Sequence, residues 1–424
     1  MKILKGFFTV VLLSVLIACT EDSVSTPVED ETGFQTPEQI VPKITRGINI
    51  GNTLEAPFEG EWYPQPLREY YFDDIKTAGF TCVRIPVRWD KHTSESAPYD
   101  IDEEWMSRVE QVVDWGLARG LYLIVNAHHE GWLKENYNEP GVKERFHAIW
   151  RQISENFKDK SGKLMFEMIN EPEGLTVGEV DEVNRDVLAI IREANPQRIV
   201  IFGGNSWSNA EQLFTAAVPD DDYLMAYYHS YDPWDFAGVG NGTWGNFDQR
   251  EAVRIKFSQV KQWADTYNIP VMISEFGAVT RCDYNSRMLH YYAYVDYSLQ
   301  CNIPFMVWDD GGDFSIYDRE NRTWSDVKDI LINTYIDGPF DLRGYYANGN
   351  NVYLAWSNRT ESTGQIIIQR KTEFGEFTDL EVLNPDVIQF HEKYYDSGIL
   401  YYRIILRQEG SPDKYSNPVK IVIP

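Results

Sequence analysis

The chain has 424 residues, and its 65 acidic and 39 basic side chains give it a formal net charge of −26. The 43% of hydrophobic and 25% of charged residues are typical of a globular protein, and the length accommodates a barrel with a small partner domain. The negative charge argues against nonspecific binding to nucleic acid and against electrostatic adhesion to anionic membranes. Aromatic residues make up 14% of the chain, which fits either an uncharged partner such as carbohydrate or an aromatic core.

The first residues are typical of a bacterial export signal. Lys2 and Lys5 precede an apolar run over residues 7–18, which is too short to span a membrane. The end of this run, Leu16-Ile17-Ala18-Cys19, resembles the lipobox of bacterial lipoproteins. That resemblance implies cleavage after residue 18 and a lipid on Cys19, with ordinary secretion as the alternative. We expect an exported protein, anchored by lipid to the bacterial cell envelope at the outer membrane or cell surface.

Residues 19–43 are acidic and contain one aromatic residue, Phe34, so the sequence predicts a flexible tether there. Beyond Cys19 the chain has three cysteines, Cys82, Cys282 and Cys301, and an odd number excludes a complete disulfide framework. A bridge between Cys282 and Cys301 stays open.

Residues 44–337 alternate β-branched runs with longer amphipathic ones. The predicted strands are 44–50, 81–87, 121–127, 163–169, 198–202, 223–228, 270–275 and 303–308. Helical patterns such as 105–119 and 253–267 lie between them. Eight predicted strands that alternate with helices indicate an α/β fold, specifically a (β/α)8 barrel.

The pattern changes to strands alone over residues 342–424. The predicted strands are 352–357, 365–371, 377–382, 387–390, 399–406 and 420–423. Short strands at this spacing predict an all-β sandwich. Trp356 and the Tyr401-Tyr402-Arg403 segment resemble a fibronectin type III domain, in which a tyrosine corner is a packing feature. We favour a spacer or a barrel-packing module over a glycan-binding one.

Polar or aromatic groups lie at or near the carboxyl end of nearly every predicted barrel strand, where a (β/α)8 barrel builds its active site. These groups are Asn49, Arg84, His128, Asn170 with Glu171, His229 with Tyr231, Glu275, and Trp308. Glu171 and Glu275 are the most informative, because each ends an apolar strand where an unpaired carboxylate would be costly to bury. Two carboxylates that face one opening can cleave a glycosidic bond, one as a protonated acid and the other as an ionised nucleophile.

Asn170-Glu171-Pro172 and Glu275 resemble the retaining β-glycosidases built on (β/α)8 barrels. Together with segments 47–56, 83–89, 127–132 and 229–231 and Trp308, they resemble glycoside hydrolase family 5, the cellulase-type family. The resemblance implies that Glu171 is the acid/base and Glu275 the nucleophile. It further implies that Arg84 and Tyr231 orient and ionise Glu275, that Asn170 and His128 hold the sugar, that His229 lies beside the acid/base, and that Trp308 stacks against the sugar.

The segment 51–55 and the His128-His129 pair resemble the endoglucanase branches of this family. The predicted substrate-binding residues are Trp308, Asn49, Glu55, His129, Trp132, Trp207 and Trp234. Trp89 and Trp244 also follow strands and are candidates for the same surface, because an indole face packs well on a pyranose ring. The remaining tryptophans of the helical patterns are predicted to be core, namely Trp105, Trp115, Trp150 and Trp263.

These observations predict a monomeric, retaining, endo-acting hydrolase of β-1,4-linked glucan that needs no cofactor and no metal. Xyloglucan and mixed-linkage glucan stay open as substrates, and so does β-mannan or another β-glycan. A surface protein that only captures glycan is a second class of function. A metal-dependent hydrolase using His128, His129 and His229 is a third, although no HxH or HExxH motif supports it.

Overall fold

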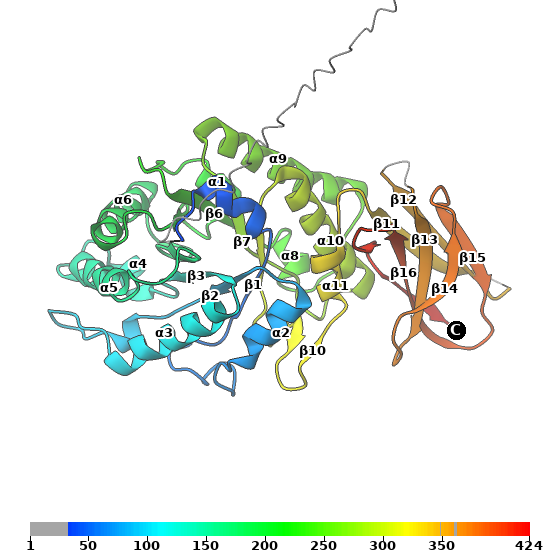
Figure 1. Ribbon diagram of the computed structural model, residues 1–424, viewed down its shortest axis with the longest axis horizontal. Helices are drawn as coiled ribbons and strands as arrows, with labels where there is room; N and C mark the ends of the chain where they lie inside the picture. The colour runs from blue at the N-terminus through cyan, green and yellow to red at the C-terminus, as the bar shows by residue number, and fades with distance from the viewer. Residues whose placement is uncertain (1–32, 348, 360–362) are drawn as a thin grey trace, which may run out of the picture.

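The computed structural model describes residues 33–347, 349–359 and 363–424. The predicted signal and Cys19 lie outside these residues. A barrel surrounded by helices occupies most of the chain, and two antiparallel sheets lie beside it at the carboxyl-terminal end (Figure 1). Both predicted fold classes are therefore confirmed.

Eight parallel strands close the barrel in chain order, with β1 paired to both β2 and β8. The strands are β1 (Arg46–Asn49), β2 (Cys82–Ile85), β3 (Tyr122–Asn126), β4 (Leu164–Glu167), β5 (Val200–Phe202), β6 (Leu224–Ser230), β7 (Val271–Phe276) and β8 (Phe305–Val307). Each lies within or overlaps a predicted strand. Almost every strand residue is buried, which explains why these segments read as continuous apolar runs.

Helices cover the outside of the barrel. They are α2 (Tyr70–Ala78), α3 (Glu103–Ala118), α5 (Val142–Asn156), α6 (Val177–Ala194), α7 (Ala210–Leu213), α9 (Phe247–Tyr267), α10 (Tyr284–Cys301) and α11 (Val327–Asn333). The loops carry η2 (Asp90–His92), α4 (Gly131–Asn136), α8 (Trp234–Ala237), β9 (Tyr317–Asp318) and β10 (Thr323–Trp324). In α3, the Asp102 side chain caps the first turn, and Trp105, Val109, Val112 and Val113 form the buried face.

The prediction of a flexible tether up to residue 43 is wrong for its last part. Residues 37–43 form α1 (Pro37–Ile40) and η1 (Val41–Lys43). Ile40 and Val41 are buried and pack with Met165 and Met306 in the core cluster inside the barrel. This short segment therefore belongs to the barrel, because its two apolar side chains are removed from water there.

The carboxyl-terminal part is a two-sheet sandwich. One sheet has the order β11-β12-β15; in the other, β14-β13-β16-β17 form a row, and β18 also pairs with β16. The strands are β11 (Pro339–Ala347), β12 (Asn351–Asn358), β13 (Gln365–Thr372), β14 (Thr378–Leu383), β15 (Gln389–Lys393), β16 (Gly398–Arg407), β17 (Lys414–Tyr415) and β18 (Val419–Ile423). Trp356, which the sequence leaves open as core or as a glycan platform, is core. Tyr402 differs from a tyrosine corner, because its hydroxyl donates to the Glu392 carboxylate and not to the backbone.

Acidic groups of α10 and α11 face basic groups of the sandwich. The ion pairs that join the two parts include Asp296 with Arg359, Asp326 with Lys371, and Asp329 with Arg403. The Tyr284 and Tyr401 rings also meet edge to face, with centroids 5.1 Å apart. The sandwich is thus packed against the barrel by complementary charge.

No helix among the described residues has the length and apolar character needed to cross a membrane. Cys82, Cys282 and Cys301 are free thiols, so the Cys282–Cys301 bridge that the sequence left open is not formed in this structure.

Candidate active site

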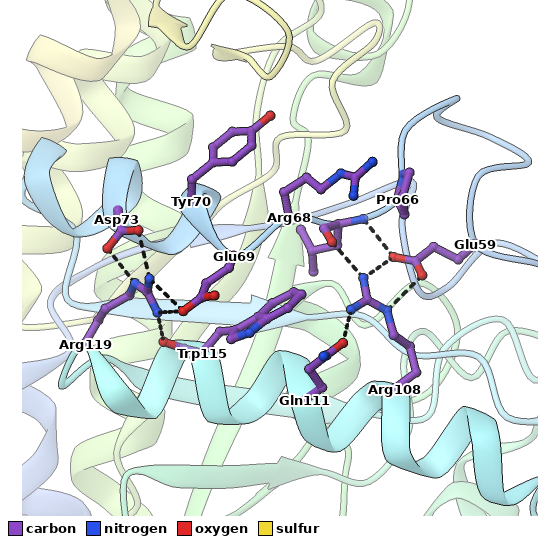
Figure 2. Close-up of a pocket in the computed structure, with 11 residues that line it drawn as sticks. Glu59, Pro66, Arg68, Glu69, Tyr70, Asp73, Arg108, Gln111, Trp115 and Arg119 are labelled. Atoms are coloured by element: carbon purple, nitrogen blue, oxygen red, sulfur yellow. Dashed lines mark hydrogen bonds and ion pairs between the residues drawn. The ribbon is translucent and has the colours of Figure 1, made fainter.

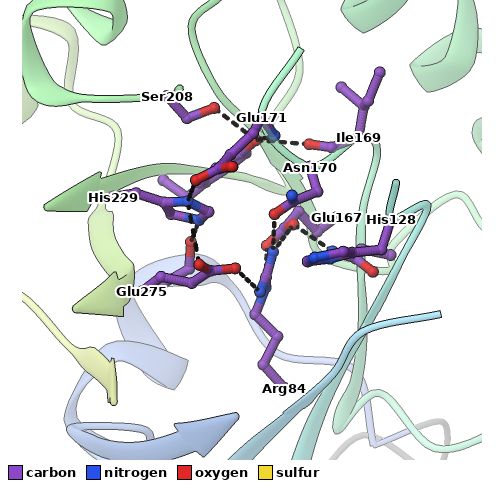
Figure 3. Close-up of polar contacts among 12 residues, drawn as sticks. Arg84, His128, Glu167, Ile169, Asn170, Glu171, Ser208, His229 and Glu275 are labelled. Atoms are coloured by element: carbon purple, nitrogen blue, oxygen red, sulfur yellow. Dashed lines mark hydrogen bonds and ion pairs between the residues drawn. The ribbon is translucent and has the colours of Figure 1, made fainter. Parts of the chain in front are cut away.

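Arg84 is the centre of a buried polar network at the mouth of the barrel (Figure 3). Its Nε and Nη2 donate to Glu167 at 2.8 and 2.6 Å, and its Nη1 donates to Glu275 at 2.6 Å. The two remaining N–H groups donate to the side-chain oxygens of Asn49 at 2.9 Å and of Asn170 at 2.7 Å. All five guanidinium donors are therefore used, which fixes the orientation of the group.

Burial alone would lower the pKa of Arg84, but the Glu167 and Glu275 carboxylates raise it above its ordinary value. The guanidinium accordingly carries a permanent charge although its side chain has no exposed surface.

Glu275 lies on β7, where a bulge separates it from the regular ladder. Tyr228 pairs with Ile273, but His229 pairs with Glu275, so Ser274 is an extra residue on β7. Such bulges re-aim side chains near active sites, and this one brings Glu275 beside His229. The Tyr231 hydroxyl donates to Glu275 Oε2 at 2.9 Å. Burial raises the pKa of Glu275, and the charge of Arg84 and the Tyr231 hydrogen bond act against that rise by favouring the carboxylate.

Glu171 follows β4 in the turn before α6. Its backbone is left-handed, with φ of 38°, and its Oε1 lies 2.8 Å from His229 Nδ1. Burial raises the pKa of Glu171 to about 7. This carboxyl group therefore holds a proton near neutral pH, as a general acid must.

His229 lies between the two carboxyl groups. Its Nδ1 is 2.8 Å from Glu171 and 3.6 Å from Glu275, while its Nε2 lies 3.0 Å from the Ser274 hydroxyl. Burial lowers the pKa of His229 to about 4, so the ring is neutral where Glu171 is protonated. One carboxyl oxygen of Glu171 and one of Glu275 lie within 4.8 Å of each other.

His128 and Trp308 face each other across the same mouth. Their rings are nearly parallel, at 12°, with centroids 6.2 Å apart. A Cβ on Gly51 would lie 2.6 Å from Trp308 Cζ2, so the absence of a side chain there lets the indole lie against the β1 loop. His129 meets the exposed Trp62 edge to face at 5.2 Å.

Trp207 and Trp234 are each 59% exposed, as a sugar-stacking role requires. Trp234 also packs edge to face on Tyr231, which places it next to Glu275. Trp132 is half-buried, donates its indole N–H to Glu130, and lies under the Arg145 guanidinium, so part of its surface is already covered.

Two predicted substrate-binding residues are corrected by the structure. Asn49 and Glu55 have no exposed surface and so cannot touch a substrate in this conformation. Asn49 donates to the Ser274 carbonyl and accepts from Arg84, while Glu55 accepts the backbone N–H groups of Asn52 and Thr53. Both therefore hold neighbouring groups of the site in place and do not bind the substrate directly. Trp89 and Trp244 are also buried and belong to the core.

Sequence reasoning missed Glu167, Trp62 and Tyr227. Glu167 is the bidentate partner of Arg84, and a glutamate inside an apolar strand was the signal that could have revealed it. Trp62 lies in the long loop after β1, where no periodicity marks it.

Among the described residues, one set of three side chains could offer converging metal ligands, Glu171, His229 and Glu275. His128 and His129 do not join it, which removes the basis for the predicted three-histidine alternative. The Arg84 guanidinium 2.6 Å from Glu275 would repel a cation at this position, so the donor set fits a proton-transfer site better than a metal site.

A separate pocket of about 860 Å³ lies on the outer wall between α2 and α3 (Figure 2). Two of its arginines pair with its acidic groups. Arg108 bonds to Glu59, and Arg119 bonds to Asp73 and Glu69. None of the candidate catalytic residues lines it.

Comparison with known proteins identifies the family. The family model of cellulase (glycosyl hydrolase family 5) matches residues 44–313. Endoglucanase H of Acetivibrio thermocellus is 45% identical over 317 residues, covering 73% of this chain and 35% of the relative, so the chain spans about a third of that protein. Endoglucanase A of Ruminococcus albus is 31% identical over 335 residues, covering 69% of this chain and 91% of the relative.

Solved structures agree with the sequence relatives. Endoglucanase Cel5A of Thermotoga maritima is 32% identical with a TM-score of 0.68, covering 70% of this chain and 100% of that one. A tri-modular endo-β-1,4-glucanase of Bacillus licheniformis, complexed with cellotetraose, is 29% identical with a TM-score of 0.77, covering 92% of this chain and 79% of that one. This chain belongs to glycosyl hydrolase family 5.

Proposed function

We propose that the chain is an endo-acting β-1,4-glucanase that cleaves its substrate with retention of anomeric configuration. The observation that carries the proposal is the separation of the two carboxyl groups, whose nearest oxygens lie within 4.8 Å. Retaining glycosidases hold their carboxyl groups about 5–5.5 Å apart, whereas inverting ones leave about 6.5–9.5 Å for a water molecule. The related proteins named endoglucanases support β-1,4-glucan as the substrate.

In the first step, a Glu275 oxygen attacks the anomeric carbon and forms a glycosyl ester as the glycosidic C–O bond breaks. Glu171 donates its proton to the departing oxygen, so the leaving sugar departs as a neutral alcohol. The raised pKa of Glu171, about 7, supports this acid role, and the Arg84 and Tyr231 donors support the anionic role of Glu275.

In the second step, Glu171, now a carboxylate, removes a proton from water as the water oxygen attacks the same carbon. The ester bond to Glu275 breaks, and both carboxyl groups return to their starting states. Two inversions at one carbon give net retention. We propose that the Asn170 amide and the His128 ring bind the sugar whose bond breaks and that Trp308 supports it; the proposal is supported by the Arg84–Asn170 hydrogen bond and by the near-parallel His128 and Trp308 rings.

The catalytic test is Glu275→Ala, with Glu251→Ala as the matched control, because Glu251 is a surface residue that pairs with Arg254 on α9. Glu275→Ala is expected to abolish release of reducing sugar from carboxymethyl-cellulose while binding to the polymer persists. Hydrolysis by Glu275→Ala at the rate of the control would contradict the assignment. A wild-type protein that binds the polymer without cutting it would favour the glycan-capturing alternative, and loss of activity with a chelator would favour a metal.

Substrate choice is the finer part of the proposal. The related Cel5A has been crystallised with mannotriose and with cellobiose, so the same barrel admits more than one β-linked backbone. We propose β-1,4-glucan as the preferred polymer, with xyloglucan and mixed-linkage glucan as candidates. A panel of these glucans with mannan and xylan, read by product length, tests the ranking, and a preference for mannan or release of only terminal units would contradict it.

We also propose that the protein is exported and anchored by a lipid on Cys19, acting as a monomer. The support is the Leu16-Ile17-Ala18-Cys19 segment after a short basic and apolar start. Labelling with an alkyne fatty acid is expected to mark the wild type and not Cys19→Ala. Equal labelling of the two would contradict the anchor.

A further inference from the structure

The backbone at Glu171 is held in an unusual conformation. Its φ of 38° is in the left-handed region, which is unfavourable for a non-glycine residue. Such a conformation persists only when the surrounding structure enforces it. The groups that hold this turn therefore decide where the Glu171 carboxyl group lies.

The Tyr227 hydroxyl is the group that meets this turn from below. Tyr227 lies on β6 and has no exposed surface. Its hydroxyl donates to the Ile169 carbonyl at 2.6 Å and accepts the Glu171 backbone N–H at 3.3 Å, and it lies 3.0 Å from the Ser208 hydroxyl. One phenol thus joins the two sides of the turn that carries Glu171.

The fold makes room for this phenol and links it to His229. A Cβ on Gly203 would lie 2.5 Å from Tyr227 Cε1, so the glycine leaves the space that the ring occupies. The Ser208 carbonyl accepts the His229 backbone N–H at 2.8 Å. Ser208 therefore contacts the Tyr227 hydroxyl with its side chain and holds the backbone of His229, the partner of Glu171, with its carbonyl.

We propose that Tyr227 is a positioning residue for the acid/base, holding Glu171 in the left-handed turn at hydrogen-bonding distance from His229. The inference rests on the proposed function, because it assigns Tyr227 to the proton transfer by Glu171. It does not make Tyr227 catalytic, since the residue is buried beneath the turn.

The chain supplies a matched control at the next position. Tyr228 is also on β6 and fully buried, and its hydroxyl has no hydrogen-bond partner among the described residues. Tyr227→Phe and Tyr228→Phe therefore make the same chemical change in the same strand, and only the first removes bonds to the Glu171 turn.

The assay compares two substrates for each variant. Cellotetraose has a poor leaving group that needs proton donation, whereas 2,4-dinitrophenyl β-cellobioside has a leaving group that departs without it. For Tyr227→Phe, kcat/KM is expected to fall about tenfold or more on cellotetraose and to change less than about threefold on the aryl glycoside. Tyr228→Phe is expected to match the wild type on both. An equal loss on both substrates, or no loss, would overturn the proposal.

Two further measurements keep the test decisive. Ser208→Ala removes one contact of the Tyr227 hydroxyl and can be measured even if Tyr227→Phe proves unstable. It is expected to lower kcat/KM on cellotetraose more than on the aryl glycoside, by a smaller factor than Tyr227→Phe. A crystal structure of Tyr227→Phe, or of Ser208→Ala, needs no activity and is expected to show Glu171 displaced from His229. An unchanged Glu171 backbone and His229 contact in that structure would overturn the positioning role, whereas a wild type inactive on both substrates would overturn the proposed function alone.

Discussion

Glu167→Gln tests whether the Arg84 network is held together by a buried charge pair. Both side chains have no exposed surface, and two hydrogen bonds of 2.8 and 2.6 Å join them. The substitution keeps the shape of the side chain but replaces one accepting oxygen with an amide NH₂ that faces an N–H of Arg84 or of Asn126. Both the charge pairing and at least one hydrogen bond are lost.

Removing one partner of a buried ion pair costs about 3–5 kcal/mol, because the remaining charge stays buried without compensation. The lower end applies here, since Glu275 still pairs with Arg84 at 2.6 Å. At about 2 °C per kcal/mol for a domain of this size, Glu167→Gln is expected to lower Tm by about 6 °C.

The matched control is Glu251→Gln. Its carboxylate bonds to Arg254 at the same 2.6 Å, but this pair lies on the surface of α9, where exposed ion pairs contribute little. Scanning calorimetry at neutral pH is expected to show a clear loss of Tm for Glu167→Gln and none for the control. If both variants have the same Tm as the wild type, the reasoning from burial is refuted.

Three further predictions follow from the same structure. With the pKa of Glu171 near 7, kcat/KM is expected to fall about tenfold per pH unit above that value as the acid loses its proton; a pH–rate profile flat through this range would contradict the acid role. Gly51→Ala is expected to raise KM because the new Cβ would meet Trp308 Cζ2 at 2.6 Å; steady-state kinetics with an unchanged KM would show that the indole position is not critical. Arg359→Ala leaves the buried Asp296 carboxylate without its cation and is expected to cost about 3 kcal/mol; an unchanged calorimetric Tm would show that this ion pair does not hold the sandwich to the barrel.

The strands of the barrel were predictable because a parallel barrel buries both faces of each strand, and such strands read as apolar runs. The first strand of the sandwich, β11, was missed for the opposite reason. Its register shifts between Phe340 and Arg343, and its charged and glycine residues interrupt any alternation. The apolar pair Ile40-Val41 was also too short to stand out from the acidic segment before it, although it closes the barrel core.

Within the site, the sequence predicts which residues lie at the ends of the strands, but it does not predict whether their side chains are exposed. Asn49 ends β1 and Glu55 follows it, as expected, yet both are buried under the mouth, because their polar atoms satisfy backbone groups. The proximity of His229 and Glu275 depends on the extra residue Ser274 in β7, and no periodicity in the sequence marks that bulge. Glu167 is the last residue of β4, and its contact with Arg84 on β2 depends on the closure of the barrel.

The charges of the network explain how one carboxyl group can serve as acid and then as base. Arg84 and Glu167 compensate each other, His229 is neutral, and Glu171 is protonated, which leaves Glu275 as the one net negative charge of this set. Because Arg84 divides its donors between two carboxylates, Glu275 is oriented without being fully neutralised. The two carboxyl groups interact, since Glu171 is one of the groups that raise the pKa of Glu275. Esterification of Glu275 in the proposed mechanism removes its charge, so we expect ionised Glu171 to be less disfavoured in the second step. Burial raises the pKa of Glu171 to about 7 in the free protein, and we expect a lower pKa in the glycosyl-enzyme, where Glu171 must accept a proton from water.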